Sequence, residues 1–223
     1  MNAIAMTGLV VLGFALTAMA AEPKDGESKT VTRYTFDEDS PGKRPRGFAF
    51  AHTRQHGKPG KWLVQAHKDA PSAGQVLGQL DDDDTNARYP MAVTTAALPA
   101  DVKVSVKCRA VSGKVDQACG LVFRYQDENN YYVTRSNVLE DNVRLYHVKN
   151  GKRRQFATWD GKVPGEVWNE LAAEAKGDTL RVYFNGKKVI EAKDRTFADG
   201  GKAGLWTKAD SITYFDDLTV TAL

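Results

Sequence analysis

Hydrophobic and polar residues alternate in short segments along most of the chain beyond residue 101. In 102–110, for example, valines alternate with lysine and serine, which is the period of a β-strand with one buried face. Two pairs, Asn150-Gly151 and Asn185-Gly186, supply the residues that tight hairpin turns require. The pattern predicts strands at 102–110, 120–125, 131–138, 143–149, 152–159, 167–176, 179–184, 187–192, 203–208 and 212–221. Short strands with turns at this spacing indicate an antiparallel sandwich or barrel.

The segment 170–176 is rich in alanine and glutamate and also has helix propensity. Leu171, Ala173 and Ala175 nevertheless alternate with Glu170, Ala172 and Glu174, and strand-like neighbours flank the segment, so we interpret it as a strand. The N-terminal half is less regular, with strands expected at 30–36, 61–66 and 75–79 and a long loop at 41–60. We expect the first strand to lie near the last one and to close the sandwich.

The N-terminus has the features of an export signal. Residues 1–21 carry no charge, and an apolar run from Leu9 to Leu16 is too short to span a bilayer as a stable helix. Ala18-Met19-Ala20 then has the form that signal peptidase accepts. We therefore predict a signal peptide at 1–20, a single β-sandwich domain at 21–223 and a periplasmic or extracellular location without membrane insertion after cleavage. The alternative interpretation is an N-terminal membrane anchor.

The charges do not indicate a polyanionic partner. The net charge is +3, and Lys, Arg, Asp and Glu are interspersed along the chain. The densest basic run, Lys152 to Arg154, follows an Asn-Gly turn and is typical of a solvated hairpin tip, so we expect no nucleic-acid binding. We expect a monomer.

Cys108 and Cys119 are the two cysteines, and an exported chain would meet oxidising conditions. If the chain reverses near Gly113, the two positions would face each other across an antiparallel pair, close enough for a bond. We favour a disulfide over two buried free thiols.

Candidate metal and nucleophile motifs are weak. Asp81 to Asp84 could bind calcium through carboxylate oxygens, but a solvated acidic loop is the more common structure. His52 and His56 lie in a loop rich in Gly and Pro, where their spacing does not indicate a metal site. No G-x-S-x-G motif occurs. We predict neither a metal nor a cofactor.

Strand parity assigns side chains to the two faces of the predicted sheet. If Leu121, Phe123, Leu145 and Leu205 point into the core, the alternate positions face outward. The outward set comprises Arg124, Tyr131, Arg135, Asn137, Asn142, Arg144, Tyr146, Trp206 and Lys208. Aromatic rings can cover the apolar faces of a sugar, while amides and guanidinium groups bind its oxygens. This face is our candidate ligand site. The alternative is that these polar residues only solubilise the sheet.

Three motifs carry a family resemblance: the stretch 120–137, which begins GLVFRY and continues to NYYVTRSN, then VYFNGK at 182–187, and GLWTK at 204–208 followed by FDDLTV. Over 102–220 the chain resembles the concanavalin A-like lectin/glucanase superfamily, closest to the bacterial 3-keto-disaccharide hydrolase domains. The resemblance implies an all-β fold, an antiparallel jelly-roll β-sandwich. The paired-carboxylate spacing of family 16 glucanases, Glu-x-Asp-x-x-Glu or Glu-x-Asp-x-Glu, does not occur, so a laminarinase-type mechanism is not expected.

Three functions are consistent with these observations. We favour non-catalytic glycan binding, because no catalytic carboxylate pair can be identified. The family resemblance instead implies a lyase or hydrolase acting on 3-keto-glycosides, with Glu140 or His147 as base and Arg124, Arg135 or Lys208 stabilising the enolate. The third hypothesis is an envelope module that binds another protein. The catalytic residues and the sugar are left open at this point.

Overall fold

The computed structural model describes Met1 and residues 30–223, so the predicted signal peptide lies outside the described residues. The described part contains fifteen strands and one short 3-10 helix, η1 (Thr53–Gln55). Sheet A contains, in spatial order, β13 (Lys187–Lys193), β12 (Thr179–Phe184), β11 (Asn169–Lys176), β6 (Val102–Ser112), β15 (Ile212–Ala222), β4 (Gln75–Gln79) and β3 (Trp62–Ala66), with β1 (Val31–Tyr34) paired to β15. Sheet B contains β10 (Lys152–Asp160), β9 (Asn142–Lys149), β8 (Asn130–Asn137), β7 (Ala118–Asp127), β14 (Lys202–Trp206), β5 (Pro90–Thr94) and β2 (Phe48–His52).

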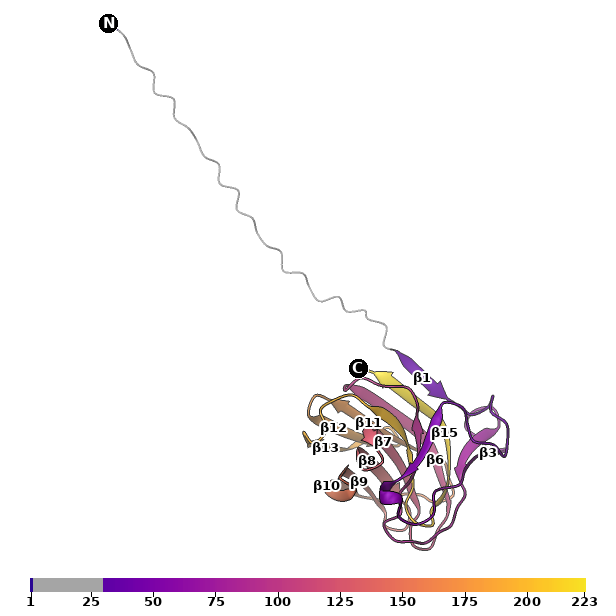
Figure 1. Cartoon of the computed structure of the whole chain (residues 1–223). Coiled ribbons are helices and arrows are strands. Elements are labelled where there is room, and N and C mark those ends of the chain that lie inside the picture. Colours follow the sequence, from indigo (N-terminus) through magenta and orange to yellow (C-terminus); the bar gives the residue numbers. More distant parts are fainter. Residues whose placement is uncertain (2–29) are drawn as a thin grey trace.

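The two sheets form a β-sandwich whose main core lies between them, which confirms the predicted all-β fold. Val104 and Val106 of sheet A and Leu121 and Leu145 of sheet B belong to this core and are almost completely buried. Every pairing between strands of the described part is antiparallel. Figure 1 shows β1 beside β15 near the C-terminus, as their register requires. The prediction that the first and last strands pair is therefore confirmed.

Most expected strands occur where the alternation placed them, including 170–176, which forms β11. The prediction of one long loop over 41–60 is wrong, because β2 and η1 lie within it. β5 is a second strand that we did not predict. All five of its residues are buried, so both of its faces are covered and it lacks the alternation that identifies a strand with one solvated face.

Cys108 and Cys119 form a disulfide, with their Cα atoms 6.2 Å apart. The geometry that we expected for this bond is wrong. Cys108 lies on β6 in sheet A and Cys119 on β7 in sheet B, so the bond joins the two layers instead of two neighbours in one sheet. Among the described residues, no helix has the length and apolar character needed to cross a membrane.

Candidate functional site

A second buried cluster covers the outer face of sheet B, on the side opposite to the main core. The cluster consists of Tyr89, Met91, Val93, Ala118, Val122, Tyr125, Tyr131, Val133, Tyr146, Val148 and Trp206. On this face, the strand register places residues of four neighbouring strands directly opposite one another in a row. Arg144 of β9 faces Arg135 of β8, Arg135 faces Gly120 of β7, and Gly120 faces Trp206 of β14. Side chains from distant segments therefore meet on one face.

Three rings and one guanidinium group form the floor of this face, which we call the aromatic platform: Tyr89, Tyr146, Trp206 and Arg153. Tyr89 stacks on Trp206 with ring centroids 5.2 Å apart. The Arg153 Cζ atom lies 4.7 Å from the Tyr89 centroid and 4.5 Å from the Tyr146 centroid. A cation above aromatic faces is attracted by the ring quadrupoles, so these contacts hold the Arg153 guanidinium in place.

An arginine cluster, comprising Arg135, Glu140, Asn142 and Arg144, adjoins the platform. Arg135 donates to Asn142 Oδ1 at 2.5 Å and to Glu140 Oε2 at 2.7 Å. Arg144 Nη1 lies 3.2 Å from the same Glu140 oxygen. Burial by itself would raise the pKa of Glu140, but the positive charge of Arg135 and the hydrogen bonds of the cluster hold that pKa below its usual value. Glu140 is therefore an ionised acceptor at neutral pH.

A bond from Arg135 Nη2 to the Tyr146 hydroxyl, at 3.3 Å, links the cluster to the platform. At the end of the same face, Lys208 contacts Asp116, whose other oxygen accepts from Asn137 Nδ2 at 2.7 Å. Burial raises the pKa of the Asp116 carboxyl, although Lys208 opposes the shift. The Asp116 side chain has no exposed surface, so its role at this face is to position Lys208 and Asn137.

Several donors on this face are buried without a hydrogen-bond partner in the described part of the chain. They include Arg135 Nε, Arg144 Nε and Arg153 Nη1. These three atoms lie below the accessible surface, whereas other parts of the Arg144 and Arg153 side chains reach it and can donate to an oxygen of a bound molecule. Their convergence beside the aromatic platform defines the candidate site.

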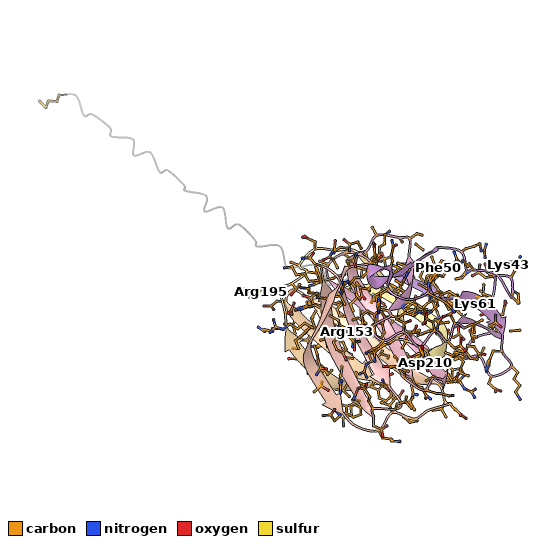
Figure 2. The ribbon with its side chains drawn as sticks, turned by 60° about the horizontal axis from the view of Figure 1, so that its bottom comes forward. Lys43, Phe50, Lys61, Arg153, Arg195 and Asp210 are labelled. Atoms are coloured by element: carbon orange, nitrogen blue, oxygen red, sulfur yellow. A yellow bond between two sulfur atoms is a disulfide. The ribbon has the colours of Figure 1, made fainter. Side chains whose placement is uncertain are left out.

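A pocket of about 500 Å³ opens beside the platform, between η1, the segment before β5 and the β9–β10 hairpin. We call it the basic pocket. Its lining residues are Thr53, Arg54, His56, Ala87, Tyr89, Gly151, Lys152 and Arg153. Figure 2 shows Arg153 between Arg195 and Lys61, which lie on opposite sides of the domain. Arg153 and Tyr89 belong to both the platform and the pocket wall, so the two features are continuous.

The structure brings together most of the residues that strand parity selected. Arg135, Asn137, Asn142, Arg144, Tyr146, Trp206 and Lys208 all lie on the outer face of sheet B, in contacts that connect them. Tyr131 and Trp206 lie on this face but are both fully buried, and the Tyr131 hydroxyl is 2.7 Å from Thr53 Oγ1. Burial also raises the pKa of Tyr131. We assign Tyr131 to the support of the platform.

Arg124 does not join the site. Its guanidinium donates to the backbone carbonyls of Ala100, Gly177 and Phe197, and the residue is 2% exposed. The register of β7 shifts between Phe123 and Asp127, and Arg124 has a φ of 45°. A bulge at this position interrupts the alternation, so parity fails beyond Phe123.

Four important residues were absent from the predicted set: Tyr89, Asp116, Glu140 and Arg153. From the sequence we considered Glu140 only as a base, and Arg153 only as part of a basic run expected at a solvated hairpin tip. Arg153 could have been found, because the two-residue turn Asn150-Gly151 pairs Arg153 with Val148 and thus places it on the outward face. Nothing local in the sequence indicates Tyr89, which precedes a strand that the pattern does not reveal.

The remaining candidates lie elsewhere. His147 stacks on Phe156, and its Nδ1 is 3.4 Å from Asp194, on the face of β9 opposite to Tyr146 and Arg144. The structure therefore excludes His147 as a base at this site. In the acidic run, Asp81 and Asp83 pair with the fully buried Arg88. The described residues contain no group of three potential metal ligands.

The fold is an antiparallel two-sheet β-sandwich that resembles the folds of lectins and carbohydrate-binding modules. No protein-family model matches the chain. Over 84 residues it is 29% identical to the levanase of Bacillus subtilis (strain 168), and this match covers 37% of the chain but only 12% of the levanase.

Three solved structures share the fold. The carbohydrate binding module CBM66 from Bacillus subtilis superimposes with a TM-score of 0.62 at 21% identity, covering 79% of this chain and 96% of the module. Lectin II from Ulex europaeus superimposes with a TM-score of 0.59 at 10% identity, covering 87% of this chain and 99% of the lectin. The third structure is domain 4 of AbnA, a GH43 extracellular arabinanase from Geobacillus stearothermophilus, in complex with arabinotriose. It superimposes with a TM-score of 0.53 at 14% identity, covering 88% of this chain and 94% of that domain. At these identities the likeness establishes the fold, and none of these proteins points to 3-keto-disaccharide hydrolysis.

Proposed function

We propose that this chain is a non-catalytic carbohydrate-binding module and that the saccharide lies on the outer face of sheet B. The observation that carries the proposal is the convergence of the partly exposed Arg144, Arg153 and Glu140 side chains beside the aromatic platform. Sugar hydroxyls can accept from the exposed N–H groups of Arg144 and Arg153, and the Glu140 carboxylate, whose side chain is 36% exposed, can accept from a hydroxyl in return. Tyr89 and Tyr146 are only 7% and 4% exposed and Trp206 is fully buried, so the rings act mainly as the support that holds the Arg153 guanidinium toward the sugar.

The relatives suggest which saccharides to test. A partial match to a levanase and a shared fold with a domain that holds arabinotriose both support a polysaccharide ligand. We therefore take levan and arabinan oligosaccharides as the first candidates. The disulfide between Cys108 and Cys119 is consistent with a location outside the cytoplasm, where such bonds persist.

Glycoside hydrolysis requires two carboxyl groups that act on one bond. On this face, Glu140 has a lowered pKa because two arginines neutralise it, and Asp116 is inaccessible beneath Lys208. Neither group is suited to act as a general acid at neutral pH. This argument favours binding without catalysis. In the alternative 3-keto-glycoside reaction, Glu140 would be the base and Arg135 would stabilise the enolate.

Calorimetric titration of the purified protein with levan and arabinan oligosaccharides tests the proposal. Arg144→Ala should weaken binding by about tenfold, because it removes charge-assisted bonds. Arg181→Ala is a matched control, since Arg181 is 28% exposed against 32% for Arg144 and also pairs with glutamate, but lies on sheet A. Equal binding by Arg144→Ala and the unmodified protein would disprove the proposed face. Incubation with 3-keto-glucosides tests the alternative. If the protein cleaves them and releases the group attached to the keto sugar, the protein is a lyase or hydrolase and the proposal of non-catalytic binding is wrong.

A further inference from the structure

The basic pocket has a composition that a neutral sugar does not require. Arg54, Lys152 and Arg153 contribute permanent positive charges, His56 is a fourth basic group, and no described residue that lines the pocket is acidic. None of the three permanent cations forms a salt bridge with a described residue, whereas Arg135, Arg144 and Lys208 nearby each do. The pocket therefore has an excess of uncompensated positive charge.

The nearest carboxylates are engaged elsewhere. Asp127 and Glu128 line a second hollow, which Arg54 also lines, but neither forms a salt bridge with Arg54, and Asp127 accepts from the backbone of Asn129 in its own turn. Asp83 accepts from the Lys58 N–H and from Thr85. These groups leave the cations of the pocket free to meet an anion from outside. Arg153 Nη1 is also buried without a partner in the described part.

The pocket wall is held in a fixed shape. The stem of Arg54 lies against Gly151, where a Cβ atom would come within 2.4 Å of Arg54 Cγ, and the Arg54 N–H donates to Asn129 Oδ1 at 3.0 Å. Arg54 and Ala87 both adopt positive φ, at 55° and 60°. Such conformations are costly for residues other than glycine and are concentrated at ligand sites, where the surroundings impose them.

We infer that the basic pocket binds the carboxylate of an acidic saccharide, a uronic acid unit next to the sugar on the aromatic platform. The inference rests on the proposed function and adds the class of ligand to it. Arg153 and Tyr89 form the wall between platform and pocket, so neighbouring units of one oligosaccharide would occupy both. A volume of about 500 Å³ lies within the range of small-ligand pockets.

Titration of the purified protein with oligogalacturonate and oligoglucuronate, each compared with its carboxyl-reduced neutral form, tests the inference. We expect the acidic form to bind about tenfold more tightly, with an affinity that falls as salt is added, because an ion pair in a partly open pocket is screened. Lys152→Ala and Arg54→Ala should remove most of this difference. Lys187→Ala is a matched control, because Lys187 also directly follows an Asn-Gly turn but lies on sheet A.

Three results would overturn the inference in distinguishable ways. In the first, neutral oligosaccharides bind, Arg144→Ala weakens that binding, and the acidic forms bind no more tightly than the neutral ones. The proposed function then stands, but the pocket does not select a carboxylate. If the acidic, neutral, levan and arabinan oligosaccharides all fail to bind, the proposed function is wrong and the inference fails with it. A sulfated oligosaccharide that binds more tightly than both uronates would assign the pocket to sulfate instead.

Discussion

At the scale of single residues, two arginines show how local backbone geometry decides function. Arg124 lies in a bulge of β7, and its guanidinium donates to three backbone carbonyls, which it links inside the domain. Arg153 stays in register with Val148, so its guanidinium reaches the rings of Tyr89 and Tyr146. The two side chains have the same chemistry. The difference in backbone register gives one a structural role and the other a place in the candidate site.

Gly120 provides a prediction at this scale. Trp206 lies directly over it, and an added Cβ atom would be 2.7 Å from Trp206 Cε3 and 2.9 Å from the Trp206 carbonyl oxygen. We expect Gly120→Ala to lower the free energy of unfolding by about 1–3 kcal/mol, because a tightly packed site resists an extra methyl group. Urea denaturation measures the loss, and tryptophan fluorescence reports the displacement of Trp206. Unchanged stability together with an unchanged spectrum would contradict this packing.

At the scale of elements, the β9–β10 hairpin and the disulfide determine how the face is assembled. The hairpin carries Tyr146, Arg144 and Arg153, and the Gly151 N–H donates to the Asn129 carbonyl at 2.9 Å, which docks the turn. The bond between Cys108 and Cys119 attaches β7 of sheet B to β6 of sheet A. It therefore restrains the strand that carries Gly120 without contributing to the candidate site.

The two cysteines of the disulfide, Cys108 and Cys119, are 11 positions apart in the sequence. For a loop of this length, chain entropy predicts that Cys108→Ala combined with Cys119→Ala lowers the free energy of unfolding by about 3 kcal/mol. Oligosaccharide affinity should be retained under conditions where the variant is still folded. Chemical denaturation with and without reductant checks the first point, since reductant should destabilise only the unmodified protein. Equal stability of both proteins without reductant would refute the assignment.

At the scale of the whole molecule, the described carboxyl groups determine how stability depends on pH. Eight of them have pKa values below their usual range: Asp37, Asp83, Glu140, Asp141, Asp178, Glu191, Asp194 and Asp210. Hydrogen bonds from Thr85 and from the Lys58 N–H lower the pKa of Asp83 in this way. Burial raises the pKa of Asp116 and Asp216, so these two groups have the opposite effect on how stability changes with pH.

A lowered pKa means that the folded protein binds fewer protons than the unfolded chain as the pH falls. The stabilisation is present above the unfolded pKa values, about 4 for these groups, and is lost as the pH drops through the folded values. We expect the melting temperature to fall by several degrees between pH 6 and pH 3. Asp83→Asn should make this fall smaller, because it removes one of the titrating groups. A melting temperature that rises toward pH 3 would show that Asp116 and Asp216 dominate.

The sequence by itself determined most of the strands, their two faces and the polar residues on the outer one. Alternation with a period of two is a local property, and Arg135, Asn142, Arg144 and Tyr146 follow it without interruption. The same pattern could not reveal β5, which is buried on both faces.

Only the tertiary structure decided what these side chains meet. The sheet order brings Tyr89, Trp206 and Arg153 together from segments far apart in the chain, and it places Cys108 and Cys119 on different layers. The bulge in β7 removed Arg124 from the face, because one irregular residue reverses the parity of those that follow. Periodicity describes each strand separately, whereas a binding site depends on which strands become neighbours and in which register.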